Sequence, residues 1–188
     1  KEKDEIIARC IDLTIQLFPN DAKGHSMKGD FMATLHKERE AIEAYEKTLQ
    51  LDPSKSAVWI ALLSIYENSY DIDPNEWQKK AQEAIDIFNF TPDFYKSKYK
   101  AEYRLGAFNS MIESCDAGLA ILIDDEREKA IFQLDKIFAL GALGKIKEAT
   151  ALAQQVFQTK KTETSALIVQ NLLWLSVYFH FSLPEIEV

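Results

Sequence analysis

The stretch AIEAYEKTLQLDPSKSAVWIALLSIY, residues 41–66, joins two segments of opposite character across a short turn. The first segment, Ala41–Leu51, places apolar residues at i, i+4 and i+7 among charged ones, which predicts a helix with one buried side. The second segment is almost uncharged and contains Trp59, which predicts a helix buried on several sides. Because one helical hairpin leaves such a surface uncovered, the pair is expected to pack on further copies of itself.

The spacing of prolines and glycines supports such copies. Pro19 and Pro53 stand 34 positions apart (53 − 19), and Pro92 follows 39 positions later (92 − 53). Gly106 and Gly144 are separated by 38 positions (144 − 106). A recurrent period of this length is typical of stacked helical hairpins. We predict a single domain over 1–188 with units at about 4–21, 22–55, 56–91, 92–125 and 129–159, followed by a terminal helix over 162–183.

The second helix of each unit repeats one apolar stripe. Stripes with helical spacing are Ile7/Ile11/Thr14/Ile15, Ala41/Tyr45/Thr48/Leu49, Ala81/Ile85/Phe88, Met111/Cys115/Gly118/Leu119 and Ala149/Ala153/Val156/Phe157. Cap-then-proline pairs at Asp73–Pro74 and Thr91–Pro92 predict helix starts. Both cysteines, Cys10 and Cys115, are expected to be small buried thiols, and Gly29 is expected where two helices approach closely. No segment alternates over a sustained length, so the sequence predicts an all-α chain.

The unit around residues 41–66 resembles the tetratricopeptide repeat. Trp59, Leu62 and Tyr66 match the pattern of its first helix, and the second-helix pattern is matched by Ala41, Tyr45, Leu49 and Pro53. The resemblance covers most of residues 4–158, about four and a half units, with two departures. His25 stands where the tryptophan is expected, and Tyr70–Asn75 adds residues between two helices.

This resemblance implies a right-handed superhelix of antiparallel helix pairs, a TPR-like solenoid closed or extended by the apolar C-terminal helix. It also implies that first helices line a concave surface and that the chain is a non-catalytic module binding a protein or peptide. The family's chaperone-tail clamp is not expected, because its positions hold Ser26, Asp30, Ala61, Asp93 and Ser97.

Composition disfavours several other functions. With 22 Lys and Arg against 30 Asp and Glu, the formal net charge is −8, which makes nucleic acid a poor partner. The glycines of GHSMKG, Gly24–Gly29, have phosphate-loop spacing but are followed by Asp30, whose charge repels phosphate. The three histidines form no metal-ligand pattern, and no nucleophile, base and orienting group assemble. We therefore expect no enzyme activity, cofactor or metal.

A local strip, YKSKYKAEYR at Tyr95–Arg104, alternates rows of tyrosine and cation along a helix. It suggests a site for an acidic peptide, formed by Lys96, Lys100, Tyr103 and Arg104 on the concave side. The alternative is that the tyrosines pack between repeats while the cations face solvent.

The uncharged segment Ala166–Leu183 leaves three interpretations open. It packs on the last repeat, forms a partner surface or homodimer, or spans a membrane; the polar residues Gln170, Asn171, Ser176, His180 and Ser182 argue against the last. The self-associating surface would contain Leu173, Trp174, Val177 and Phe181, and the alternative function is then a structural or assembly role. A signal preceding Lys1 would not be visible, so the compartment is left open, with the cytoplasm favoured.

Overall fold

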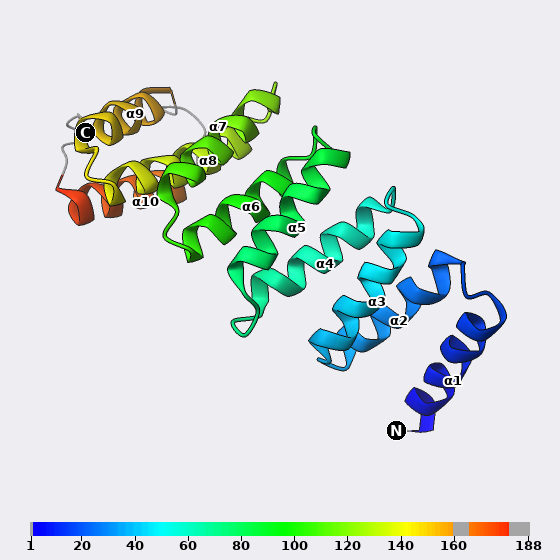
Figure 1. Ribbon diagram of the computed structural model, residues 1–188. Helices are drawn as coiled ribbons and strands as arrows, with labels where there is room; N and C mark the ends of the chain where they lie inside the picture. Colours follow the sequence, from blue (N-terminus) through cyan, green and yellow to red (C-terminus); the bar gives the residue numbers. More distant parts are fainter. Residues whose placement is uncertain (1, 160–165, 181–188) are drawn as a thin grey trace. The chain divides into compact units, whose positions relative to one another are not determined.

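The computed structural model describes residues 2–159 and 166–180, and every regular element in these ranges is an α-helix. The ten helices, shown in Figure 1, are α1 (Glu2–Leu17), α2 (Ala22–Thr34), α3 (Glu38–Leu51), α4 (Ser56–Asn68), α5 (Pro74–Ile87), α6 (Pro92–Arg104), α7 (Phe108–Ile121), α8 (Glu126–Ala142), α9 (Ile146–Thr159) and α10 (Ala166–Phe179). The expected all-α class is confirmed. Helices α5 and α6 begin at Pro74 and Pro92, as the two cap-then-proline pairs predicted.

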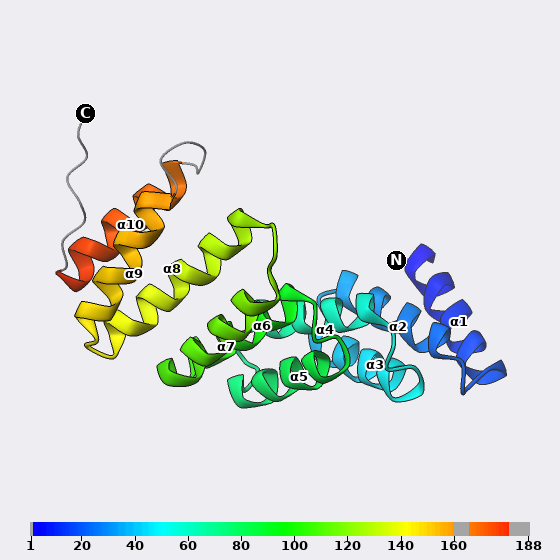
Figure 2. The ribbon, with the colours of Figure 1, turned by 90° about the horizontal axis from the view of Figure 1, so that it is seen from above.

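The chain divides into two compact units, residues 1–89 and 90–188. In the first unit, α1 to α5 pack in chain order, each on the next. In the second, α6, α7, α8 and α9 do the same, and α10 packs on both α8 and α9 (Figure 2). The first interpretation of the apolar terminal segment, packing on the last helix pair, is therefore confirmed for α10, and it leaves one face of this helix exposed. No described helix combines the length and the apolar character needed to cross a membrane.

Helix α4 packs on neighbours at two sides, as its sequence predicted. It contacts α3 before it and α5 after it, and Trp59, Leu62 and Tyr66 are all buried. The Tyr66 hydroxyl donates a hydrogen bond to Glu76 on α5 at 2.9 Å, so the ring is buried while its polar end is satisfied. The apolar character of α4 thus follows from its two packing partners.

Gly29 lies where α2 and α3 meet, as expected. A Cβ atom at this position would overlap the ring of Tyr45, so no other residue fits without displacing that ring. The same ring is fixed at its far end, because the Tyr45 hydroxyl donates to Asp30 at 2.8 Å. Glycine therefore allows the buried tyrosine of one helix to lie directly on the backbone of the other.

His25, which stands where the repeat pattern expects a tryptophan, makes the same kind of hydrogen bond that Trp59 makes in the next unit. The Trp59 indole N–H donates to the Pro53 carbonyl at 3.0 Å and so ties the first helix to the preceding corner. One unit earlier, His25 Nε2 donates to the Pro19 carbonyl at 3.1 Å across the same sequence separation. His25 therefore keeps the hydrogen bond to the preceding proline carbonyl but has a smaller ring than tryptophan.

Of the two predicted cap-then-proline starts, one forms its capping hydrogen bond and the other does not. Asp73 caps α5 by accepting from the Asn75 N–H, and Pro74 occupies the first turn. Asp125 caps α8 in the same way through the Glu128 N–H. Thr91 is at the cap position of α6, but its side chain makes no capping bond, so Pro92 alone marks that start.

The second unit has two buried clusters, one among α8, α9 and α10 and one where α6, α7 and α8 meet. Phe132 is fully buried, packs edge-on against Tyr99, and lies directly over Gly118, where a Cβ would overlap its ring. Cys115 is buried in this cluster, as expected, and burial raises the pKa of its thiol. The same expectation for Cys10 is wrong, because α1 has a neighbouring helix on one side only and Cys10 lies on its exposed side.

Candidate binding groove of the second unit

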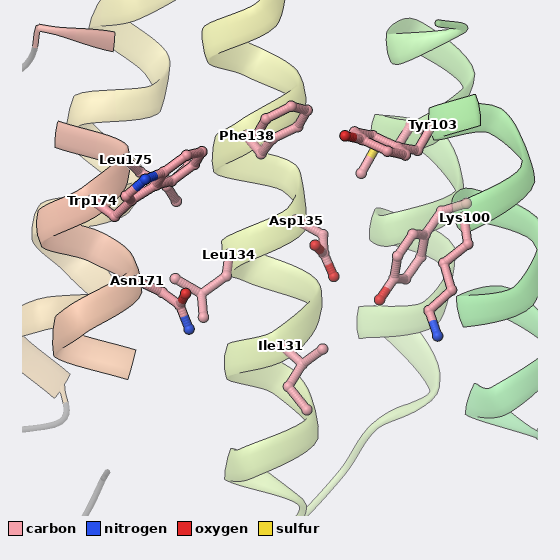
Figure 3. Close-up of a pocket in the computed structure, with 11 residues that line it drawn as sticks. Lys100, Tyr103, Ile131, Leu134, Asp135, Phe138, Asn171, Trp174 and Leu175 are labelled. Carbon is pink, nitrogen blue, oxygen red and sulfur yellow. The ribbon is translucent and has the colours of Figure 1, made fainter. Parts of the chain in front are cut away.

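A groove with a volume of about 450 Å³ lies within the second unit, chiefly among α6, α8 and α10. Figure 3 shows α8 as its floor, with α6 and α10 as its walls. The lining residues are Tyr99, Lys100 and Tyr103 from α6, Met111 from α7, Ile131, Leu134, Asp135 and Phe138 from α8, and Asn171, Trp174 and Leu175 from α10. The walls belong to helices that are far apart in sequence, so only folding brings them together.

Helical spacing explains why these residues share one surface. On α8, Ile131, Leu134 and Phe138 follow one another at intervals of three and four, which places them on one face. The neighbouring positions Phe132 and Ala139 are fully buried on another face, in the core with α7. Helix α8 therefore supplies both the core of the second unit and the floor of the groove.

Aromatic rings stand on both sides of this floor. Tyr103 and Phe138 pack with ring centroids 5.4 Å apart, and Phe138 packs on Phe179 at 5.6 Å, both near edge-to-face. On the opposite wall Trp174 stacks on Tyr178 at 5.0 Å. Trp174 is 55% exposed and Tyr103 is 51% exposed, and both point toward Phe138 (Figure 3). The groove thus presents large aromatic surface to solvent from two directions.

Asp135 is the acidic group of the groove and is already held by its neighbours. Burial raises the pKa of its carboxyl above the usual value, while the Tyr99 hydroxyl, which donates to it, and the charge of Lys100 act in the opposite direction. Burial, together with the same contact with Asp135, raises the pKa of Tyr99. Asp135 is therefore a buried carboxyl group with Tyr99 as a hydrogen-bond donor and Lys100 as a nearby cation.

The residues predicted for the peptide strip take different places. Lys100 and Tyr103 line the groove. Lys96, one turn earlier on α6, forms ion pairs with Asp93 at 2.7 Å and with Glu128 of α8 at 2.8 Å. Burial acts to lower the pKa of Lys96, but these two carboxylates outweigh it and leave the pKa raised. Arg104 is half-buried at the end of α6.

Of the residues predicted for an oligomer or partner surface, one lines the groove and two lie outside it. Trp174 belongs to the groove, whereas Leu173 and Val177 lie on an exposed face of α10. Val177 is 74% exposed. Phe181 lies outside the described residues. Helix α10 is anchored through its opposite face, where Leu172 and Leu175 are buried against α8 and α9.

Local sequence patterns did not identify the floor of the groove, nor Asn171 as a residue of its wall. The spacing of an apolar stripe is present at Ile131, Leu134 and Phe138, in the first helix of the unit predicted at 129–159. The stripe was not recognised as a groove because α8 carries apolar residues on several faces. Asn171 counted only as a polar interruption of an apolar segment.

A second cavity, of about 390 Å³, lies within the first unit and is lined by α3, α4 and α5. Lys80 of α5 crosses it and pairs with Glu46 of α3 at 2.9 Å and with Glu83 at 3.1 Å. Trp59 and Leu62 form its apolar base. Within the part of the chain that the structure describes, no three His, Cys, Asp or Glu side chains gather in a way that would hold a metal ion.

Comparison with known proteins defines the class of fold. No family profile and no curated protein matches the sequence. Among solved structures, MamA from Desulfovibrio magneticus RS-1 is 14% identical, with 86% of this chain and 88% of that chain covered and a TM-score of 0.64. YrrB, described as a TPR protein with an unusual peptide-binding site, is 14% identical, with 90% and 84% covered and a TM-score of 0.63.

A third structure, TTC0263, is described as a thermophilic TPR protein of Thermus thermophilus. It is 13% identical, with 90% of this chain and 85% of that chain covered and a TM-score of 0.52. At these identities the likeness establishes the fold, which is that of tetratricopeptide-repeat proteins.

Proposed function

We propose that this chain is a non-catalytic protein-interaction module and that the groove of its second unit binds a segment of a partner protein. The observation that carries the proposal is the pair of exposed aromatic side chains, Trp174 and Tyr103, facing one another across an apolar floor. Large aromatic side chains in partly open sites supply most of the binding energy in many protein interfaces. A groove of about 450 Å³ also falls in the range of sites that take a ligand.

The repeat fold supports this function in two ways. Helix α8 packs on α7 and α9, and α10 packs on both α8 and α9, so the fold holds the groove in one shape and little ordering cost opposes binding. One protein with the same fold, YrrB, is described as having a peptide-binding site. The groove also uses α6 and α8, two of the first helices that the family resemblance expects on the concave surface.

The acidic character proposed for the partner segment rests on the cations of α6. Lys100 lines the groove, and Arg104 follows it by one turn on the same helix. Both would lie beside carboxylates of a bound segment. Lys96 is less suited to this role, because Asp93 and Glu128 already pair with it.

Peptide display on the immobilised chain tests the proposal. We expect selected peptides to bind the wild-type chain, and we expect the double substitution Lys100→Gln and Arg104→Gln to weaken binding by no more than roughly tenfold. The matched control is Lys129→Gln, which removes a cation of α8 that lies outside the groove lining. A chain from which no binding peptide is selected would contradict the proposed function.

A second candidate function, self-assembly, is favoured by the exposed apolar face of α10. Leu173 and Val177 lie on this face beside the Trp174–Tyr178 stack. Light scattering of the wild-type chain and of the double variant Leu173→Asp, Val177→Asp tests it. A dimer that becomes a monomer on substitution supports assembly, and a monomer in both forms removes this candidate.

A further inference from the structure

We infer that the groove recognises one large apolar side chain of an extended partner segment, and that this anchor, rather than charge, carries the affinity. The anchor would lie on Leu134 and Phe138 between Trp174 and Tyr103 (Figure 3). The inference rests on the proposed function and adds the chemistry of the ligand. The partner segment would be close to neutral at the anchor, with acidic residues only at its flanks.

The shape of the groove favours a side chain over a whole helix. Its volume of about 450 Å³ is at the small end of ligand sites, which suits one or two bulky side chains. The floor carries the apolar side chains of Ile131, Leu134 and Phe138 beside the carboxyl of Asp135, and water on the apolar side chains is released when an apolar group enters. The edge-to-face contacts of Phe138 with Tyr103 and Phe179 fix the ring that an anchor would meet.

Two cations of α6, Lys96 and Lys100, already have carboxylates of the protein beside them, which argues against an affinity carried mainly by ion pairs. Lys96 has Asp93 and Glu128 as partners, and the charge of Lys100 is opposed by Asp135. A carboxylate of the ligand would compete with these internal partners for the same cations. The net gain from such an exchange is small in water. A neutral apolar group meets no such competition.

Two polar side chains on the walls suit the backbone of an extended segment. The amide of Asn171 both donates and accepts, and the hydroxyl of Tyr103 does the same. Asn171 is exposed on α10, and Tyr103 stands on α6 across the floor from it (Figure 3). An extended segment lying between them presents backbone N–H and C=O groups at its sides, and its side chains alternate, so one of them can point to the floor.

Tryptophan fluorescence gives a direct test, because the three tryptophans differ in exposure. Trp59 is 4% exposed and Trp77 is 1% exposed, so quenching by iodide reports mainly on Trp174. A peptide obtained by display on the wild-type chain serves as the probe. We expect it to protect the chain from iodide quenching, and we expect no such protection in Trp174→Phe.

Binding constants of the same peptide test which group carries the affinity. Replacing its bulky apolar residue by alanine is expected to weaken binding at least tenfold, and neutralising its acidic residues at most about threefold. Trp174→Ala should match the first loss. The control Ile123→Ala removes an apolar residue that is 80% exposed and outside the groove, and it should leave binding unchanged.

Each other outcome overturns the inference in a distinguishable way. Peptides that bind equally well to wild type and Trp174→Ala would overturn the inference and the groove as the binding site, while a protein-interaction module with its site elsewhere would still stand. A consensus of acidic residues alone, with binding lost in 0.5 M salt as charge screening requires (~3–5 Å Debye length), would assign the affinity to the cations. If the chain self-associates and the peptide reverses this, the occupant of the groove is a second copy of the chain. If the synthetic peptide FSLPEIEV, residues 181–188, binds, the occupant is a segment of the chain itself. Failure to select any peptide contradicts the proposed function itself.

Discussion

The two cavities of this protein are similar in size and opposite in chemistry. The cavity of the first unit, about 390 Å³, is crossed by Lys80 and its two glutamates, and its tryptophan, Trp59, is buried. The groove of the second unit, about 450 Å³, has an apolar floor, and its tryptophan, Trp174, stands exposed on one wall. The charged side chains that line the first cavity, Glu46, Lys80 and Glu83, already pair with one another. The second presents groups that a partner can still contact.

Volume alone therefore does not identify a binding site in a repeat protein. Both cavities arise from the same cause, because helices that pack in pairs leave spaces along their junctions. What differs is whether the side chains around the space are satisfied within the fold. Substitutions in the two places should therefore separate effects on stability from effects on binding.

The largest expected effect distinguishes the two tryptophans. Trp59→Ala should lower the free energy of unfolding by about 3–5 kcal/mol, because it removes a buried ring and its hydrogen bond to Pro53. Trp174→Ala should lower it by less than about 1 kcal/mol, because the ring is 55% exposed. Urea denaturation followed by circular dichroism measures both. Equal losses of stability would contradict the structural contrast between the cavities.

Two glycines of the second unit sharpen the comparison between packed and open positions. Gly118→Ala should destabilise the chain by about 1–3 kcal/mol, because its Cβ would overlap the buried ring of Phe132. Gly106→Ala should lower the stability less, by about 1 kcal/mol. No atom lies within 4 Å of the Cβ that it would add, and only its φ of +67° is unfavourable for alanine. Thermal unfolding of both variants checks the order, and a larger loss at Gly106 would contradict it.

Lys80 tests whether the first cavity is held by its own ion pairs. Burial acts to lower the pKa of this lysine, but Glu46 and Glu83 outweigh it, and the net pKa is raised. A raised folded pKa means that the stabilising contribution is present at neutral pH and is lost as pH rises through that folded pKa. Lys80→Met should therefore cost up to about 1 kcal/mol at pH 7 and correspondingly less in strong base. Unfolding free energies measured at the two pH values check this, and a stability gain at pH 7 would show that the cavity prefers an apolar lining.

The smallest expected effect on stability is that of Asp135, the buried carboxyl group of the groove. Its folded pKa is raised, chiefly by burial, so protonation favours the folded state. Stability linked to this group is complete below its unfolded pKa and falls as pH rises through the folded value. Asp135→Asn should remove that fall, which a comparison of unfolding free energies at acidic and neutral pH would detect. An unchanged pH profile would show that Tyr99 and Lys100 fully offset the burial.

Much of the fold could be predicted from local periodicity. The stripe of α3, with Ala41, Tyr45 and Leu49, is buried as predicted, and the cap at Asp73 begins a helix where expected. Helical spacing depends only on neighbours within two turns, so a single sequence contains it. The close contact at Gly29 was also predictable, because a glycine within a helix of a repeat marks a place of close approach.

The candidate site was predicted only in part, for a physical reason. Lys100 and Tyr103 were found because they lie in one visible strip, and the structure places both in the groove. Lys96 belongs to the same strip, yet its ion pair with Glu128 joins residues 32 positions apart, and no local pattern contains that contact. Asn171 and Phe138 meet the strip only through folding.

The sequence by itself determined the helices, their repeat and the sides that must be buried, because these depend on the covalent order of apolar and polar residues along a regular backbone. Tertiary structure decided which of the remaining side chains are satisfied and which stay open. Trp59 and Trp174 are both tryptophans in apolar helices. Trp59 is buried because α4 packs between two neighbouring helices, whereas Trp174 stays exposed because α10 packs on α8 and α9 through another face.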